Sequence, residues 1–157
     1  DWSSDVCFSD IWTSARPTAE MRVFFDSSAF VKRYVREPGT NAVLDWCDRA
    51  TEIGLSAIAL PEIVSAFCRL RREASIDDGQ YRQLKHLLLA DIEDAAICDL
   101  SPAVLAQTLA SLEAAPLRGM DAIHIGSARV LPVDVFVSAD QRQIDALRLA
   151  GLRVETV

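Results

Sequence analysis

Four acidic residues stand where an α/β protein usually carries its chemistry. Asp26 directly follows the apolar run at 23–25, and Asp140 follows a second apolar run later in the chain. Glu62 and Asp121 lie near the starts of two apolar helical segments. Because carboxylates that crowd together repel one another, such a set usually needs a hard divalent cation to hold it. The four acids therefore indicate metal-assisted phosphate chemistry.

Each acid also has an ordinary structural explanation. Asp26 is able to cap the helix that follows it through its side chain. Glu62 and Asp121 would be favourable negative charges in the first turn of a helix. Asp140, however, repeats the strand-end pattern of Asp26 in Ser138-Ala139-Asp140. The signal is the set of four acids at the ends of elements, and not any one of them.

The elements that must position these acids alternate between strand and helix patterns. This alternation predicts a three-layer α/β/α sandwich around a mostly parallel sheet of about five strands. Ligands of such sheets bind outside the carboxyl ends of the strands. Strands are expected at 22–25, 53–58, 96–100, 134–138 and 152–157, and helices at 27–34, 41–50, 61–73, 78–95, 101–115, 121–131 and 141–150.

Composition sets limits on the class of protein. The 157 residues suit one domain, and the formal net charge of −7 argues against indiscriminate nucleic-acid binding, although local basic patches remain possible. No apolar run approaches the roughly 20 residues of a membrane helix. The four cysteines, at 7, 47, 68 and 98, have no paired spacing, so we expect reduced thiols in a cytoplasmic protein.

Residues 1–20 do not share the pattern of the rest of the chain. They are rich in Ser and Asp, show no helical or alternating apolar period, and precede Met21, where the strand pattern begins at once. They also lack the basic start and apolar stretch of a signal peptide. We therefore expect a non-native or disordered leader at 1–20 and one folded domain at 21–157.

Four segments in order resemble the motifs of the PIN domain family, and in particular its VapC-type toxins. They are FFDSSAFVKRYVREPG, LPEIVSAFCRLRRE, GMDAIHIGSA and VFVSADQRQ. The resemblance implies a metal-dependent endoribonuclease, the toxin of a type II toxin–antitoxin pair. It further implies that Asp26, Glu62, Asp121 and Asp140 surround Mg²⁺ or Mn²⁺. It also implies an RNA substrate, a cognate antitoxin and a homodimer, with no membrane association.

Several polar residues near the motifs have possible supporting roles. Ser28 and Ser138 are placed to hold carboxylates or metal-bound water, although local capping explains each of them too. His124 shares a helix face with Asp121, and we interpret it as a buried structural residue because imidazole adds little to an oxygen-rich Mg²⁺ site. Asp145 is interpreted as part of a solvated face. Basic residues that could meet RNA phosphates are Lys32, Arg33, Arg36 and Arg118.

Other functions are less consistent with the same residues. A phosphatase of the haloacid-dehalogenase type would need a second Asp at position 28, which is Ser28. A phospho-receiver would need a Lys after a late strand, where the chain offers Arg142. The alternative that stays open is a PIN-like module that binds RNA or protein without cleaving. Apolar residues of the helices at 61–95 (Phe67, Leu70, Tyr81, Leu84) are a possible surface for a partner helix.

Overall fold

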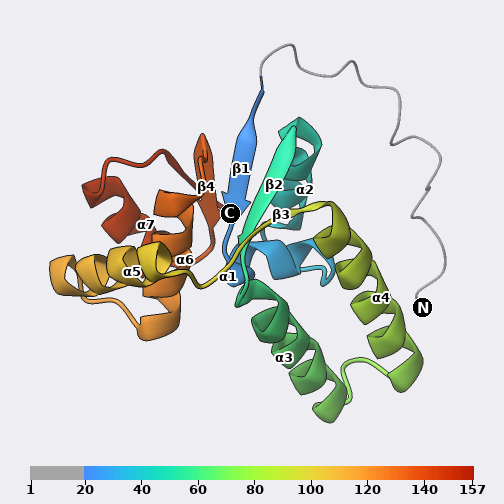
Figure 1. Cartoon of the computed structure of the whole chain (residues 1–157). Coiled ribbons are helices and arrows are strands. Elements are labelled where there is room, and N and C mark those ends of the chain that lie inside the picture. Colours follow the sequence, from blue (N-terminus) through green and yellow to red (C-terminus); the bar gives the residue numbers. More distant parts are fainter. Residues whose placement is uncertain (1–19) are drawn as a thin grey trace.

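The computed structural model describes residues 20–157, which form seven α-helices and one sheet of five short strands. Figure 1 shows how these elements are arranged. The strand order is β3-β2-β1-β4-β5, and every neighbouring pair is parallel. The predicted parallel sheet of about five strands is therefore confirmed. The strands are β1 Arg22–Phe25, β2 Glu52–Ser56, β3 Ala96–Cys98, β4 Val135–Ser138 and β5 Val154–Thr156.

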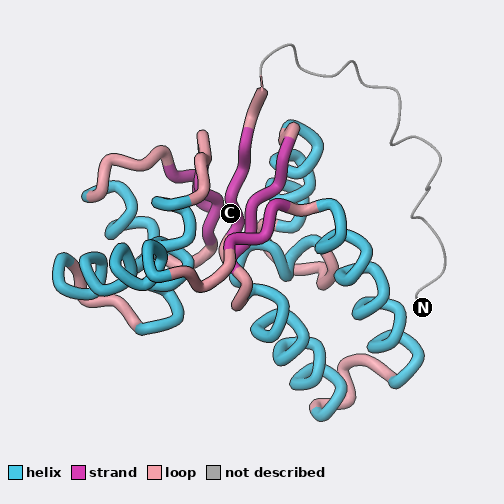
Figure 2. The backbone as a smooth tube through the Cα atoms, viewed as in Figure 1, coloured by secondary structure: helices cyan, strands magenta, loops and turns pink. Residues whose placement is uncertain are grey.

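Helices cover both faces of the sheet, as expected for three layers (Figures 1 and 2). The four α-helices α1 to α4 pack in one apolar cluster, and α6 and α7 pack in a second cluster on the opposite face of the sheet. The helix α5 lies against α6. The helices are α1 Ser27–Phe30, the 3₁₀ turn η1 Val31–Arg33, α2 Thr40–Arg49, α3 Ala59–Arg72, α4 Asp78–Asp94, α5 Pro102–Ala114, α6 Gly119–Val130 and α7 Gln141–Leu149.

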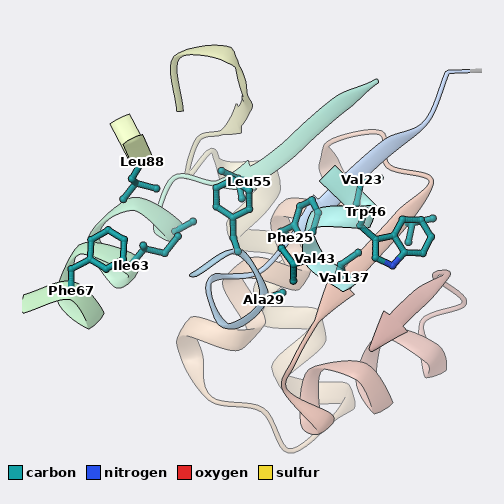
Figure 3. Packing of buried hydrophobic residues seen from close by; sticks show 13 residues of the cluster. Val23, Phe25, Ala29, Val43, Trp46, Leu55, Ile63, Phe67, Leu88 and Val137 are labelled. Carbon is teal, nitrogen blue, oxygen red and sulfur yellow. The ribbon is translucent and has the colours of Figure 1, made fainter. Parts of the chain in front are cut away.

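The central strand β1 contributes side chains to both apolar clusters because successive side chains of a strand point to opposite faces. Val23 and Phe25 enter the larger cluster, which Figure 3 shows together with Trp46 of α2 and Phe67 of α3. Phe24 points the other way and belongs to the second cluster, where it stacks on a phenylalanine of β4 with ring centroids 5.1 Å apart. All of β1 after its first residue is buried, so its carboxyl end is held rigidly.

The strand order reverses between β1 and β4. From β1 the sheet grows through β2 to β3 on one side, while β4 and β5 lie on the other side. Phe25 pairs with Val137, which aligns the carboxyl ends of the two strands. Connections diverge at such a reversal and leave a crevice, which is where open α/β sheets bind ligands. The residues after β1 and β4 therefore meet at the edge of the sheet that usually carries function.

Several element boundaries differ from those expected. The helices α3 and α6 each begin two residues earlier than predicted, at Ala59 and Gly119, which puts Glu62 and Asp121 inside their first turns. The single helix expected at 27–34 is a short α-helix followed by a 3₁₀ turn. β3 is two residues shorter than expected at its carboxyl end. Of the leader expected at 1–20, residues 1–19 lie outside the described residues, so that expectation stays a prediction.

A close approach of α5 and α6 depends on Gly126. A Cβ atom at this position would lie 2.8 Å from the carbonyl oxygen of Val104 and would also clash with the Thr108 hydroxyl. Real Cβ atoms do not sit that close to backbone, so a larger residue would push the helices apart. Because α6 also carries Asp121 and His124, this contact helps to set where those side chains lie.

Three cysteines lie in the part of the chain that the structure describes. Cys47, Cys68 and Cys98 are free, and burial raises the pKa of Cys47 to about 11, so this thiol stays protonated at neutral pH. Between residues 20 and 157 no helix combines the length and the apolar character needed to cross a membrane.

Candidate active site

Asp26 ends β1 and is completely buried. Its carboxylate caps α1 by accepting the backbone N–H of Ala29 at 2.9 Å. The Ser28 hydroxyl donates to it at 2.8 Å, and the Ser138 hydroxyl donates to Oδ2 at 2.6 Å. Burial raises the pKa of Asp26, and the hydrogen bonds from Ser138, Ser28 and the Ala29 backbone offset this only in part. The surrounding groups therefore do not fully compensate for burying the negative charge of this carboxylate.

The two serines tie Asp26 to the turn that follows β4. Ser138 Oγ accepts the backbone N–H of Asp140 at 3.0 Å, and Ser28 Oγ accepts the backbone N–H of Ala139 at 3.2 Å. Each hydroxyl therefore joins the Asp26 carboxylate to the backbone of a neighbouring strand end. This network aligns the first and the last acid of the predicted set.

Asp140 and Asp121 form a second, adjoining group. Asp140 caps α7, and its Oδ1 accepts the backbone N–H groups of Arg142 at 2.8 Å and Gln143 at 3.4 Å. The side chain of Gln143 turns back and donates to Asp121 Oδ1 at 3.2 Å. Burial raises the pKa of Asp121, and the negative charge of Asp140 raises it further. The two carboxylates are therefore close enough to repel each other.

Glu62 is held by a buried histidine. His124 Nε2 lies 2.6 Å from Glu62 Oε2, and the Ser27 hydroxyl donates to the same oxygen. Burial acts to raise the pKa of Glu62, but the hydrogen bonds from His124 and Ser27 outweigh it and lower the pKa. Glu62 is thus held as a carboxylate.

Three residues of this site were not assigned a role from the sequence. His124 is buried, as expected, but its contact with Glu62 was not predicted; its spacing of three residues from Asp121 was the available signal. Ser27 belongs to the first motif, but its contact with Glu62 was not predicted. Gln143 is buried and sits in the first turn of α7, a location that follows from the cap at Asp140 but does not reveal its partner.

The ordinary capping explanations also hold for the acids. Asp26 and Asp140 cap α1 and α7, while Glu62 and Asp121 lie in the first turns of α3 and α6. Capping and membership of a common site are therefore compatible for each of these acids. All four helices begin near the carboxyl edge of the sheet, and the positive ends of their dipoles favour carboxylates there.

Within residues 20–157, no group of three or more His, Cys, Asp or Glu side chains is arranged as a metal site. The carboxylates are instead held by hydrogen-bond donors of the protein. The donor set nevertheless fits a hard cation, because it consists of carboxylate oxygens. Asp121 Oδ2 is buried without a hydrogen-bond partner, and burial raises the pKa values of both Asp26 and Asp121. A cation would relieve each of these conditions.

Two of the four predicted basic residues are already engaged away from the acids. Arg33 donates to both carboxylate oxygens of Asp91, at 2.7 and 3.1 Å, and so joins η1 to α4. Lys32 donates to the Pro38 carbonyl at 2.6 Å and is 12% exposed. These contacts give Arg33 and Lys32 structural roles, and RNA contact by either residue stays a prediction.

The other two basic residues are exposed. Arg118 immediately precedes α6, and its positive charge offsets a small part of the rise that burial and Asp140 cause in the pKa of Asp121. It is therefore the predicted base that the fold brings beside the acids. Arg36 lies in the loop before α2. Asp145 is exposed on α7, where Gln141 donates to it at 2.7 Å, so it faces solvent as expected.

Comparison with known families identifies the class to which this parallel α/β fold belongs. The model of the family described as the PIN domain matches residues 23–148. The chain therefore belongs to the PIN domain family, and the resemblance found in its motifs is confirmed.

Relatives of known description narrow the class to VapC proteins. Ribonuclease VapC46 of Mycobacterium tuberculosis is 32% identical over 134 residues, which cover 84% of this chain and 95% of that protein. The structure resembles that of VapBC2 from Rickettsia felis bound to a DNA fragment from its promoter, with a TM-score of 0.63, 13% identity, and coverage of 87% of this chain and 99% of that one.

A further solved structure has the same fold. VapC20 of Mycobacterium tuberculosis, described as a sarcin–ricin loop cleaving toxin, matches with a TM-score of 0.59 and 13% identity over 79% of this chain and 94% of that one. The fold and the curated relatives are thus those of VapC-type toxin ribonucleases, as the motifs indicated.

Proposed function

We propose that this protein is the toxin of a toxin–antitoxin pair and hydrolyses RNA phosphodiester bonds with a divalent cation, Mg²⁺ or Mn²⁺. The observation that carries the proposal is the placing of Asp26. It is a fully buried carboxylate with a raised pKa, at the strand-order reversal, in a chain whose curated relatives are ribonucleases. A buried charge of this kind is commonly functional, since it is unfavourable for the fold alone.

The cation would be held by Asp26, Asp121 and Asp140, with Glu62 as a ligand or as the group that positions the attacking water. Bound there, it would neutralise phosphate charge and lower the pKa of a water molecule. Ser28 and Ser138 hold the Asp26 carboxylate in place through their hydroxyls.

Other side chains would act on the substrate or on the acids. Gln143 holds one oxygen of Asp121 and leaves the other unpaired. Arg118, exposed beside Asp121, would contact an RNA phosphate next to the cleaved bond.

The proposed macromolecular partners follow from the relatives. Solved neighbours include toxin–antitoxin complexes, such as one from Klebsiella pneumoniae, and we extend an antitoxin partner to this chain. Homodimerisation is proposed from the resemblance to the family alone. Of the apolar residues considered for a partner helix, Phe67 is fully buried, while Leu70, Tyr81 and Leu84 are half-buried.

The test is cleavage of structured RNA with Mg²⁺ by the wild type and by Asp26→Ala, with Asp145→Ala as the matched control. Asp145 is also an aspartate, but it is exposed and lies on the outer side of α7. We expect cleavage by the wild type and the control, none by Asp26→Ala, and none after chelation. Equal cleavage by the wild type and Asp26→Ala would refute the assignment.

A module that binds RNA or protein without cleaving is the competing function. It is distinguished by calorimetry with Mn²⁺ and by RNA binding measured in parallel. RNA binding by the wild type without Mn²⁺ binding or cleavage would favour that module.

A further inference from the structure

His124 lies among the acids and is almost inaccessible. Its side chain is 2% exposed, and it lies near enough to Asp26, Glu62 and Asp121 to offset part of the effect of burial on the pKa of each carboxyl group. Its one short contact, however, is to a single atom, Glu62 Oε2, at 2.6 Å. A residue central to the site is therefore attached to only one of the acids.

The hydrogen-bond pattern defines which atom carries the proton. The Ser27 hydroxyl gives its proton to Glu62 Oε2, so the Ser27 oxygen is free to accept from His124 Nε2, which lies 3.1 Å away. The carboxylate oxygen likewise only accepts. Nε2 must therefore be protonated and is shared between Glu62 and Ser27. A protonated Nε2 has no lone pair for a metal, and Nδ1 is buried without a partner.

His124 and Ser27 both contact Oε2 of Glu62. The Glu62 side chain would be able to move without these contacts. Glu62 is 29% exposed, and a glutamate loses substantial rotamer freedom when it is fixed. His124 and Ser27 hold Oε2 in place, while Oε1 is left available to a ligand.

We propose that His124 is a positioning residue that holds Glu62, through Oε2, in the orientation needed for cation binding and cleavage. The inference rests on the proposed function, because it concerns the same metal site. His124 acts through Glu62 and does not itself touch the cation or the RNA. Groups that orient metal ligands in this way typically contribute about 10- to 100-fold to metal affinity.

The test measures the Mn²⁺ dissociation constant by calorimetry for the wild type, H124L, H124Q, E62Q and the double variant H124L/E62Q. Leucine removes the donor, whereas the amide of glutamine keeps an N–H at a similar reach. We expect H124L to weaken Mn²⁺ binding by about 10- to 100-fold, and H124Q to restore most of the loss. In the E62Q background, H124L should add no more than about twofold.

Ser127→Ala is the structural control, because Ser127 is also buried on α6 but bonds to Ser56 and not to Glu62. It should leave Mn²⁺ binding as in the wild type. If H124L does not fold, Ser27→Ala is the substitute, because the half-buried Ser27 hydroxyl donates to the same Glu62 oxygen. We expect it to weaken Mn²⁺ binding in the wild-type background and to have little effect in the E62Q background.

Unchanged Mn²⁺ binding in H124L, or an equal loss in the wild-type and E62Q backgrounds, would overturn the positioning role and leave the proposed function standing. A wild type that binds no Mn²⁺ at all would overturn the metal-dependent function itself, and the positioning role with it.

Discussion

The substitution Asp26→Asn should separate stability from function. The carboxylate is fully buried, and burial raises its pKa despite hydrogen bonds from Ser28, Ala29 and Ser138. The charged form therefore lowers the stability of the metal-free protein at neutral pH. Asparagine removes that charge with almost no change in volume, so we expect the metal-free variant to be about as stable as the wild type.

The magnitude follows from the contacts. Asparagine keeps an oxygen for the donors at Oδ1, while the Ser138 hydroxyl at Oδ2 loses its acceptor. One neutral hydrogen bond is worth about 1 kcal/mol, and relief of the buried charge offsets it, so the net change should stay within about 1 kcal/mol. If hydrogen bonds to the charge dominated instead, at roughly 1.5–3 kcal/mol each, the variant would lose several kcal/mol.

The effect of pH has a defined sign. The folded pKa of Asp26 lies above the reference value of 3.8, so the unfavourable contribution is fully present above the folded pKa. It diminishes as the pH falls through the folded pKa and disappears below 3.8. The wild type should therefore gain stability relative to Asp26→Asn as the pH is lowered from neutral.

Bound Mn²⁺ should make the wild type more stable than Asp26→Asn. At about 100 times its dissociation constant, a ligand of the folded state adds about 2.7 kcal/mol, which for a chain of this size is roughly 5–11 °C in melting temperature. The assay is thermal unfolding by circular dichroism with EDTA or Mn²⁺ between pH 5 and 7.5, with the exposed Asp145→Asn as control. A metal-free loss above about 3 kcal/mol, or an undiminished Mn²⁺ shift in Asp26→Asn, would refute the reasoning.

Three further substitutions test separate parts of the structure. Gly126→Ala should lower the free energy of unfolding by about 1–2 kcal/mol in urea, because overpacking against Thr108 outweighs the gain of about 1 kcal/mol in helix propensity; a stabilised variant would contradict the close approach. Asp91→Ala leaves the guanidinium of Arg33 without its carboxylate and should lose about 2–3 kcal/mol with Mn²⁺ affinity unchanged by calorimetry. Arg118→Ala should raise KM for RNA and reduce the salt dependence of RNA binding by about one unit of slope, with Mn²⁺ affinity near that of the wild type; an unaltered salt slope would remove Arg118 from the RNA contacts.

The fold was largely predictable because its signals are local. Apolar runs ending in Asp26 and Asp140 mark strands, and the alternation of strands with helices leads to a parallel sheet. The boundaries of α3 and α6 were missed by two residues at their starts. Helix ends are set by cap hydrogen bonds, such as that from the Ala122 N–H to the Arg118 carbonyl, which a pattern of apolar residues does not reveal.

The pairing of side chains within the site was less predictable. Glu62 and His124 are separated by 62 residues, and no local pattern links them. Their contact depends on how α3 and α6 are rotated and how closely they approach the sheet. The same holds for Arg33, which the sequence placed beside Asp26 as a possible RNA contact but which the fold turns toward Asp91 of α4.

By itself, the sequence determined the parallel α/β architecture and the family, and it selected the four acids as candidates for the site, because strand ends, helix starts and motif order are properties of short segments. Only the tertiary structure decided what holds each acid. It attached Asp26 to Ser138 across 112 residues and Glu62 to His124, and it engaged two of the predicted bases elsewhere. Such contacts depend on strand order and helix packing, which join distant parts of the chain and are established only when the whole core forms.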